Sequence, residues 1–294
     1  YVTVGDEGRL DASNVLIDQL RDQKPMARAT LPGRDDLSRL WRTHSFPHNG
    51  VQVLDPVSED LPDDYRAFFT ALRAVPLRLW ELTNTRDIIG LTASMGSMID
   101  SGEFEIAGYF EVTRAMAMTP APRDRGQVVW LRNKRFLPRA AFYQAWDVLP
   151  EQKVLDRLAS PAWDPKTMLL VEGKTLDARP DPLPPANEVA IDAYTANRVG
   201  LHLTAPAPGI VLLNDRYDPG WRVTVDGAPA ELLKCNAIMR GVKVAAGPHR
   251  IEFVYRPYRL NFIACLCALF VFAAWGVARL AARRRAMTPQ VAPG

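Results

Sequence analysis

The sequence predicts an α+β extracytoplasmic region, followed by a small antiparallel β-sandwich and one C-terminal transmembrane helix. Three observations predict this order. Helical and strand-like spacings alternate in the first part of the chain, short strands separated by turn residues fill the second, and a long uncharged apolar run comes last. The predicted segments are an α+β domain at 1–177, a linker at 178–187, the sandwich at 188–257, the transmembrane helix at 260–280 and a cytoplasmic tail at 281–294.

Three helices are predicted before the linker. Ser13 or Asn14 can cap a short helix that extends to Asp22, because these side chains accept hydrogen bonds from the free backbone N–H groups of a first turn. A second helix begins at Pro62, where the apolar residues that follow recur at i, i+3, i+4 and i+7. The third covers residues 150–160.

Short apolar or alternating runs predict the strands of this region, since successive side chains of a strand point to opposite faces. One or two further helical turns are predicted at 77–83, around Trp80. The predicted strands are 87–91, 103–106, 109–118, 127–131, 140–146 and 167–171.

The segment at 178–187 contains four prolines, which lack a backbone donor and restrict φ, so it is predicted to be an extended linker. The region after it is predicted to be all β. Asp226-Gly227 lies between Val225 and Ala228 and indicates a tight hairpin. The predicted strands are 188–193, 198–205, 209–213, 221–225, 239–244 and 249–255.

The apolar run from Leu260 to Ala278 carries no formal charge. A helix of this length spans roughly 28 Å at 1.5 Å per residue, which is close to the hydrocarbon thickness of a bilayer. The alternative is a buried core helix. Four arginines follow the run and two, Arg256 and Arg259, precede it, so the positive-inside rule places the C-terminus in the cytoplasm and residues 1–259 outside.

The charges of the chain are nearly balanced, with 36 basic and 33 acidic residues among 294. The segment from Leu260 onward has four arginines and no acid, so the remainder has 32 basic and 33 acidic residues and a charge of −1. This balance argues against a nucleic-acid partner. Cys265 and Cys267 lie in the apolar run, which leaves Cys235 without a partner for an intramolecular disulfide in the outer region.

Five short segments in the C-terminal part of the sequence form one pattern: Asn214 to Trp221 (NDRYDPGW), Val225-Asp226-Gly227, Arg240-Gly241-Val242, Ala246-Gly247 and Phe253 to Pro257 (FVYRP). In this pattern the sequence resembles bacterial YfhO-type membrane proteins. The segments Leu137-Pro138-Arg139-Ala140 and Leu82-Thr83-Asn84 resemble two upstream family segments more weakly.

The resemblance implies that the chain is the C-terminal portion of a polytopic protein of the bacterial inner membrane, similar to GT-C glycosyltransferases. Such proteins are thought to pass a sugar from a polyprenyl-phosphate donor to an envelope acceptor, with their catalytic carboxylate in the first outer loop of the membrane bundle. The implied partners are therefore the lipid bilayer and, through that bundle, the polyprenyl-phosphate sugar and an envelope glycan. No catalytic residue, metal ligand or cofactor site is predicted in this chain.

Asp215, Tyr217, Asp218, Trp221 and Arg240 are the candidate ligand-binding residues. Aromatic rings beside carboxylates are typical of sugar sites, because their faces stack on the apolar side of pyranose rings. The favoured alternative is structural. In that interpretation Trp221 fills the sandwich core, the aspartates cap a turn and Arg240 forms a buried ion pair at a bulge.

Other candidate groups are interpreted as structural. The pairs Asp35-Asp36 and Asp63-Asp64 are adjacent carboxylates whose side chains point apart on a helix, and Pro47 prevents a regular helix from aligning His44 with His48. Two functions remain open: the accessory outer domain of a sugar-transferring membrane protein, and a noncatalytic membrane-anchored module that binds glycan or protein.

Overall fold

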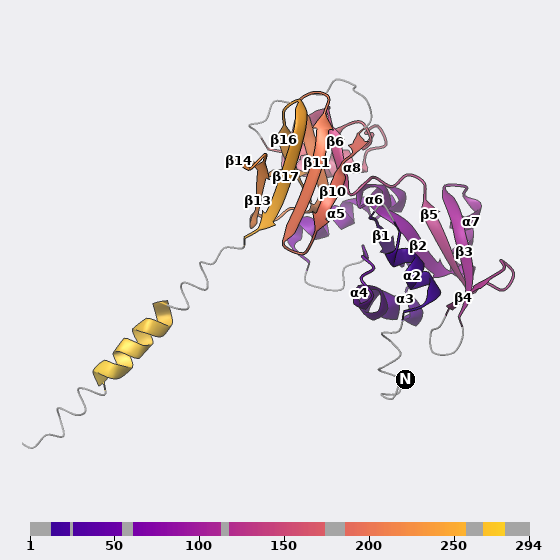
Figure 1. Ribbon diagram of the computed structural model, residues 1–294. Coiled ribbons are helices and arrows are strands. Elements are labelled where there is room, and N and C mark those ends of the chain that lie inside the picture. The colour runs from indigo at the N-terminus through magenta and orange to yellow at the C-terminus, as the bar shows by residue number, and fades with distance from the viewer. Residues whose placement is uncertain are drawn as a thin grey trace, which may run out of the picture.

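The computed structural model describes residues 13–23, 26–54, 61–112, 118–173, 186–256 and 267–279. Its architecture is mostly β, with three sheets and several short helices (Figure 1). One sheet belongs to an N-terminal unit, and the other two face each other in a β-sandwich. The mixed α and β content of the N-terminal region and the sandwich after it agree with the predicted fold class, except that one strand pair of the sandwich, β7–β8, is parallel.

The N-terminal sheet has the order β1-β2-β5-β3-β4, and only the β1–β2 pair among these is parallel. One face is covered by the short helices near the N-terminus, which bury Leu16, Ile17, Trp41 and Phe46 against it. The strands are β1 (Arg28–Thr30), β2 (Thr85–Leu91), β3 (Phe104–Val112), β4 (Met118–Ala121) and β5 (Val128–Asn133). The covering helices are α2 (Val15–Arg21), α3 (Asp36–Leu40), the π-helix η1 (Trp41–Ser45) and α4 (Phe46–His48).

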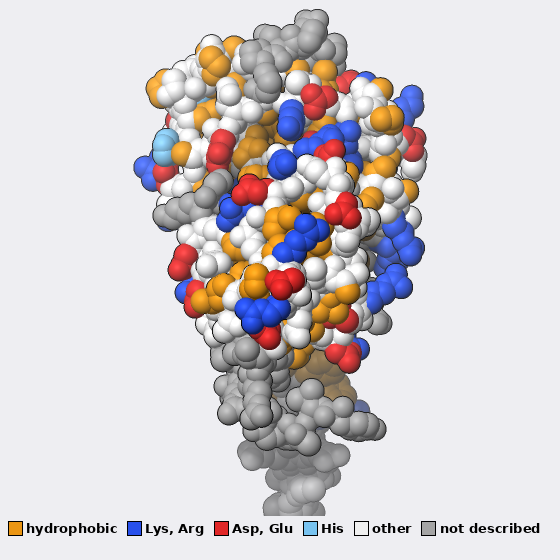
Figure 2. All heavy atoms as spheres, turned by 90° about the vertical axis from the view of Figure 1, so that its right-hand side faces the viewer, with side chains coloured by type: hydrophobic (Ala, Val, Ile, Leu, Met, Phe, Trp, Pro, Cys, Tyr) orange, Lys and Arg blue, Asp and Glu red, His pale blue; other side chains and the backbone are white. Residues whose placement is uncertain are grey.

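The opposite face of this sheet has its own apolar cluster, in which Trp80 packs against Phe104 with ring centroids 6.1 Å apart. Trp80 lies on α6 (Pro76–Leu82). A 3-10 turn, η2 (Thr92–Ser94), and α7 (Gly96–Asp100) connect β2 to β3. Figure 2 views the molecule from the right-hand side of Figure 1, where β3, β4 and α7 lie, and shows acidic, basic and hydrophobic side chains interspersed over that side.

The sandwich consists of a five-stranded sheet, β10-β11-β17-β13-β14, and a seven-stranded sheet, β7-β8-β15-β16-β12-β6-β9. Apolar side chains between the two sheets, including Val199, Val211, Trp221 and Phe253, form the core. The five-stranded sheet contains β10 (Ala190–Tyr194), β11 (Arg198–Ala205), β13 (Trp221–Val225), β14 (Ala228–Ala230) and β17 (Gly247–Tyr255). The other sheet contains β6 (Ala140–Tyr143), β7 (Trp146–Leu149), β8 (Leu169–Glu172), β9 (Asn187–Glu188), β12 (Gly209–Arg216), β15 (Leu233–Cys235) and β16 (Met239–Val244).

Strands from both sides of the predicted linker share the seven-stranded sheet. β12 pairs with β6, and Cys235 of β15 pairs with Val171 of β8, so three strands from before residue 178 belong to the sandwich. Most of the linker, residues 178–185, lies outside the described residues. The sandwich thus contains more of the chain than the residues 188–257 predicted for it.

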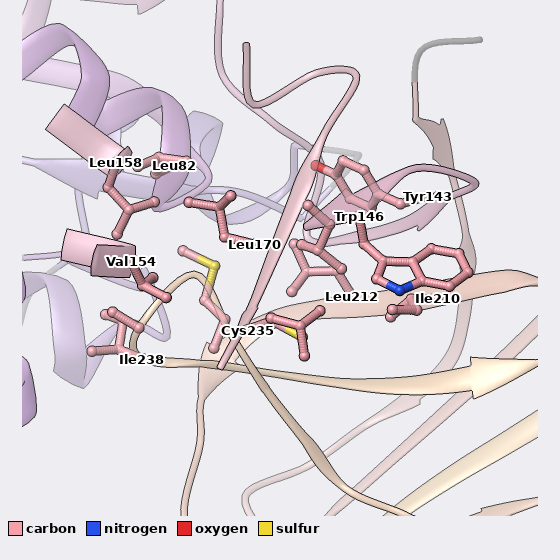
Figure 3. Close-up of a cluster of buried hydrophobic side chains, with 14 of the residues drawn as sticks. Leu82, Tyr143, Trp146, Val154, Leu158, Leu170, Ile210, Leu212, Cys235 and Ile238 are labelled. Atoms are coloured by element: carbon pink, nitrogen blue, oxygen red, sulfur yellow. The ribbon is translucent and has the colours of Figure 1, made fainter. Parts of the chain in front are cut away.

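Helices α5 (Asp63–Leu72) and α8 (Glu151–Ala159) pack beside the seven-stranded sheet and form the largest apolar cluster. Figure 3 shows Val154 and Leu158 of α8 gathered with Leu170 of β8 and with Ile238, which lies in the turn before β16. Both helices begin directly after a proline, as their sequences predict.

Most predicted elements are confirmed, and three predictions differ from the structure. The predicted strand 188–193 is two strands, β9 and β10, which belong to different sheets. The predicted strand 140–146 is two strands, β6 and β7, that occupy distant places in one sheet. The predicted strands 103–106 and 109–118 include one continuous strand, β3, which has a register shift between Ile106 and Gly108. A bulge interrupts the alternation of side chains and therefore resembles a break in the sequence pattern.

A helix covers residues 267–279, and its apolar side chains are exposed, with Phe270 75% and Phe272 71% accessible. Residues 260–266 and 280 of the predicted transmembrane helix, and the tail 281–294, lie outside the described residues. Among the residues that are described, no helix is both long and apolar enough to cross a membrane. The transmembrane helix stays a prediction.

Candidate functional site

Asp215, near the end of β12, lies among three arginines that come from distant parts of the chain. Its Oδ1 is 3.0 Å from Arg28 Nη2 and 3.1 Å from Arg139 Nε, and its Oδ2 is 3.3 Å from Arg240 Nη2. The hydroxyl of Tyr194 also donates to Asp215 Oδ2 at 2.9 Å. We call Asp215, Arg28, Arg139 and Arg240 the arginine cluster.

The arginine cluster connects the N-terminal sheet to the sandwich. Arg28 lies on β1, Arg139 immediately precedes β6, and Arg240 lies on β16. Arg28 also donates to the Thr83 carbonyl at 2.6 Å and to the Asn214 carbonyl at 2.9 Å. These contacts join the N-terminal sheet to the seven-stranded sheet of the sandwich. The arginine cluster therefore fixes the N-terminal unit against the sandwich.

Two buried asparagines support the cluster. Asn84 has a left-handed backbone (φ +56°), which Asn tolerates better than most residues. Its amide donates to the Leu137 carbonyl at 2.9 Å and its Oδ1 accepts from Arg139 Nη1 at 3.3 Å. Asn214 donates to the Leu82 carbonyl and accepts from Arg28. These amides fix the arginine side chains without adding charge.

The arginine cluster carries an excess of positive charge, because three arginines and one aspartate give a formal +2. The side chains are 4% to 16% exposed. Burial, together with the nearby charge of Arg139, lowers the pKa of Arg28 to about 10, and burial also lowers the pKa of Arg240. Since a pKa of about 10 is still well above 7, Arg28 remains charged at neutral pH.

The five residues predicted to bind a ligand have different surroundings. Asp215 and Arg240 meet in the cluster. Trp221 is buried in the sandwich core, where the Arg240 guanidinium lies 3.8 Å from its ring centroid and Tyr255 lies 5.2 Å away. These contacts match the structural interpretation of Trp221.

Asp218 and Tyr217 lie in the turn before β13. The Asp218 carboxylate accepts a hydrogen bond from the Gly220 backbone at 2.7 Å, and the Tyr217 backbone N–H donates to the Ile238 carbonyl at 2.7 Å. An aspartate that accepts from the residue two positions later is a common stabiliser of turns. Ligand binding by the five predicted residues stays a prediction.

A cavity of about 520 Å³ borders the cluster at Arg139 and Tyr194. Its walls are the end of α2, the segment Gly50–Gln52, Asp87 of β2 and the consecutive residues Glu188–Tyr194. Arg139 Nη2 donates to the Tyr194 hydroxyl at 2.6 Å and also to Gln52 Oε1. The cavity thus lies between the N-terminal unit and β10, the first strand of the five-stranded sheet.

Asp87 is a buried carboxylate in the cavity wall. It accepts from Trp130 Nε1 at 2.8 Å and from Arg86 Nε at 3.0 Å, and Arg132 Nε lies 3.9 Å away. Burial raises its pKa despite these partners. Within the described residues, no group of three His, Cys, Asp or Glu side chains could hold a metal ion.

The sequence predicts part of this site. Asp215 and Arg240 are among the candidate ligand-binding residues, and Arg139 lies in the Leu-Pro-Arg-Ala segment that resembles the family. Arg28, Gln52 and Tyr194 carried no local signal. Their contacts with the cluster join residues that are 21 to 187 positions apart, and spacing along the chain does not encode which of these residues meet.

The family model described as the bacterial membrane protein YfhO matches residues 185–267. This segment of the chain is similar to the YfhO family. No curated protein and no solved structure matches it. The matched YfhO segment contains β9 to β17 and all five predicted ligand-binding residues, whereas Arg28 and Arg139 precede it. The arginine cluster therefore combines residues from inside and outside the segment that matches the YfhO model.

Proposed function

We propose that this chain is the extracytoplasmic accessory part and last membrane helix of a longer YfhO-like protein that transfers a sugar from a polyprenyl-phosphate donor to a cell-envelope acceptor. The observation that carries the proposal is the YfhO match over residues 185–267. In this proposal the donor site and the catalytic carboxylate belong to an N-terminal membrane bundle. The part described above holds the acceptor beside that bundle.

The proposed location is the bacterial inner membrane. Residues 1–259 lie outside, residues 260–280 form the helix that crosses, and the arginine-rich tail lies in the cytoplasm. The uncharged run from Leu260 to Ala278, the four arginines after it and the exposed apolar side chains of helix 267–279 support this topology.

Fusions at the C-terminus test the topology. A fluorescent protein that folds only in the cytoplasm is expected to be bright after residue 294, and alkaline phosphatase at the same position is expected to be inactive. The same two reporters inserted after Gly173, which is proposed to lie outside, serve as the control. There the fluorescent protein should be dark and the phosphatase active. Active phosphatase at residue 294 would contradict the proposed orientation.

Sugar transfer is tested on membranes that contain the complete protein. Radiolabelled polyprenyl-phosphate sugar is supplied, and label in the envelope polymer is measured. We expect label in the polymer with the complete protein and little or none in a strain without the gene. A complete protein that lacks residues 13–256 should bind the donor normally but transfer poorly. Normal transfer by this deletion would exclude the acceptor-holding role.

The second candidate function is a noncatalytic membrane-anchored module that binds glycan or protein. The cavity favours it, because 520 Å³ is within the range of about 300–1,000 Å³ typical of small-molecule sites. The transfer assay separates the two functions. Saccharide binding without any dependence of transfer on the gene would favour the module.

A further inference from the structure

Two side-chain amides in the cavity wall are left without good acceptors. Within the described residues, Gln23 Nε2 is buried and has no hydrogen-bond partner. Among the described residues, Gln52 Nε2 donates only to the thioether sulfur of Met26, at 3.8 Å. Both residues line the cavity. Buried donors are paired in most native structures, so two such donors in one wall indicate a ligand that supplies acceptor oxygens.

The charge beside these donors favours an anionic acceptor. Arg139 lines the cavity and belongs to the arginine cluster, whose formal charge is +2. Burying net charge is costly unless an opposite charge approaches it. An oxyanion at the Arg139 end of the cavity would compensate the excess and would accept from the amides of Gln23 and Gln52.

The acidic residues of the cavity wall do not supply this compensation. Asp87 is already paired with Arg86 at 3.0 Å. Asp192 is 2.6 Å from His202 Nδ1, and Glu188 is an exposed residue of β9. Asp192 and Glu188 belong to the strand side of the cavity, so they favour placing an anion toward Arg139 and Gln52.

The remaining wall is largely apolar and includes Leu20, Met26, Val51, Val189 and Ile191. This surface suits the less polar body of a small molecule whose charged group lies elsewhere. We propose that the cavity binds a phosphoryl-bearing small molecule, with the phosphoryl group at the Arg139 end and hydrogen-bonded to Gln23 and Gln52. This site does not depend on the proposed sugar transfer.

A phosphoryl group has several possible sources, and the experiment distinguishes two of them. Residues 1–294 are purified in detergent, and isothermal titration at constant ionic strength measures binding of glucose 1-phosphate, inorganic phosphate and glucose. In a separate arm, phosphatidylglycerol is supplied in nanodiscs. We expect glucose 1-phosphate to bind, inorganic phosphate to bind more weakly, and glucose not to bind.

Gln23 is the residue that tests the site most directly, because its amide makes no hydrogen bond to the rest of the described protein. Gln23→Leu removes the donor and should weaken binding about tenfold, as expected for one hydrogen bond to a charged group. Gln23→Glu should weaken it further by repulsion. Gln152→Leu and Gln152→Glu are the matched controls, because they make the same changes on the exposed face of α8. Both should bind glucose 1-phosphate as the unmodified chain does.

Blocking the cavity provides a second variant. Ala27 lines the cavity, and Ala27→Trp should abolish binding, whereas Ala228→Trp on β14 should not. Circular dichroism must show cooperative unfolding of each variant. If phosphatidylglycerol binds, the soluble phosphates do not, and Ala27→Trp abolishes the lipid binding, the site is supported and its phosphoryl group comes from a lipid. Equal binding of glucose and glucose 1-phosphate, or phosphate binding that both Gln23 variants leave unchanged, would overturn the proposal.

Discussion

The guanidinium of Arg28 and the carboxylate of Asp215 meet at 3.0 Å although 187 positions separate them in the chain. Arg28 lies on β1 of the N-terminal sheet, and Asp215 lies on β12 of the sandwich. This contact, with those of Arg139 and Arg240, joins the two units. It makes Asp215 the residue on which the charge balance of the interface depends.

Asp215→Asn is expected to destabilise the protein strongly. It leaves three buried arginines without their carboxylate, and loss of one partner of a buried ion pair typically costs about 3–5 kcal/mol. Urea denaturation followed by circular dichroism measures the loss. Asp218→Asn, which affects a half-buried turn carboxylate, should cost about 1 kcal/mol or less.

A double-mutant cycle tests whether repulsion among the arginines causes this loss. Arg28→Leu removes one of the three positive charges, so Asp215→Asn should cost less in that background than in the unmodified chain. Costs that add without coupling would show that Arg28 and Asp215 do not interact.

Trp221→Ala is expected to lower the free energy of unfolding by about 3–5 kcal/mol, because it empties a buried site in the sandwich core. It also removes the ring beside the Arg240 guanidinium. Trp275→Ala serves as the control, since Trp275 is 56% exposed and should change little. A stable Trp221→Ala variant that has lost saccharide binding would instead favour a ligand-contact role.

Cys235 is expected to be unreactive in the folded protein. Its thiol is fully buried, and burial raises its pKa well above that of a free cysteine, so the reactive thiolate is scarce. In a chain with Cys265→Ser and Cys267→Ser, a thiol reagent should label Cys235 only after denaturant unfolds the protein. Fast labelling at pH 8 without denaturant would contradict the buried position.

The raised pKa of Asp87 predicts a specific pH dependence. The folded protein holds the Asp87 proton more tightly than the unfolded chain does, so the stability that Asp87 contributes falls as pH rises from about the unfolded value of 3.8 through the folded pKa. The unfolding free energy of the unmodified chain minus that of Asp87→Asn should therefore decrease over this window. Denaturant titrations at several pH values measure the difference, and an increase with pH would contradict the assignment.

The local patterns of the sequence were sufficient for much of the fold. Alternating apolar residues and the Asp226-Gly227 turn located β13 and β14 as a hairpin region, and the spacing after Pro62 located α5. Short strands are harder to predict from the sequence. β1 has only three residues and its alternation is too brief to detect, so it was not predicted. The division of 140–146 into β6 and β7 was not predicted because Ala140 to Trp146 reads as one apolar run.

By itself, the sequence determined the order of an α+β region, a mostly antiparallel sandwich and an apolar C-terminal run, because helix and strand periods and turn residues are local properties. Only the tertiary structure decided that β6, β7 and β8 complete the sandwich and that three arginines gather around Asp215 beside a cavity. The reason is that side chains separated by 25 to 187 positions meet only once the strands are paired, and no spacing along the chain records which strands will pair.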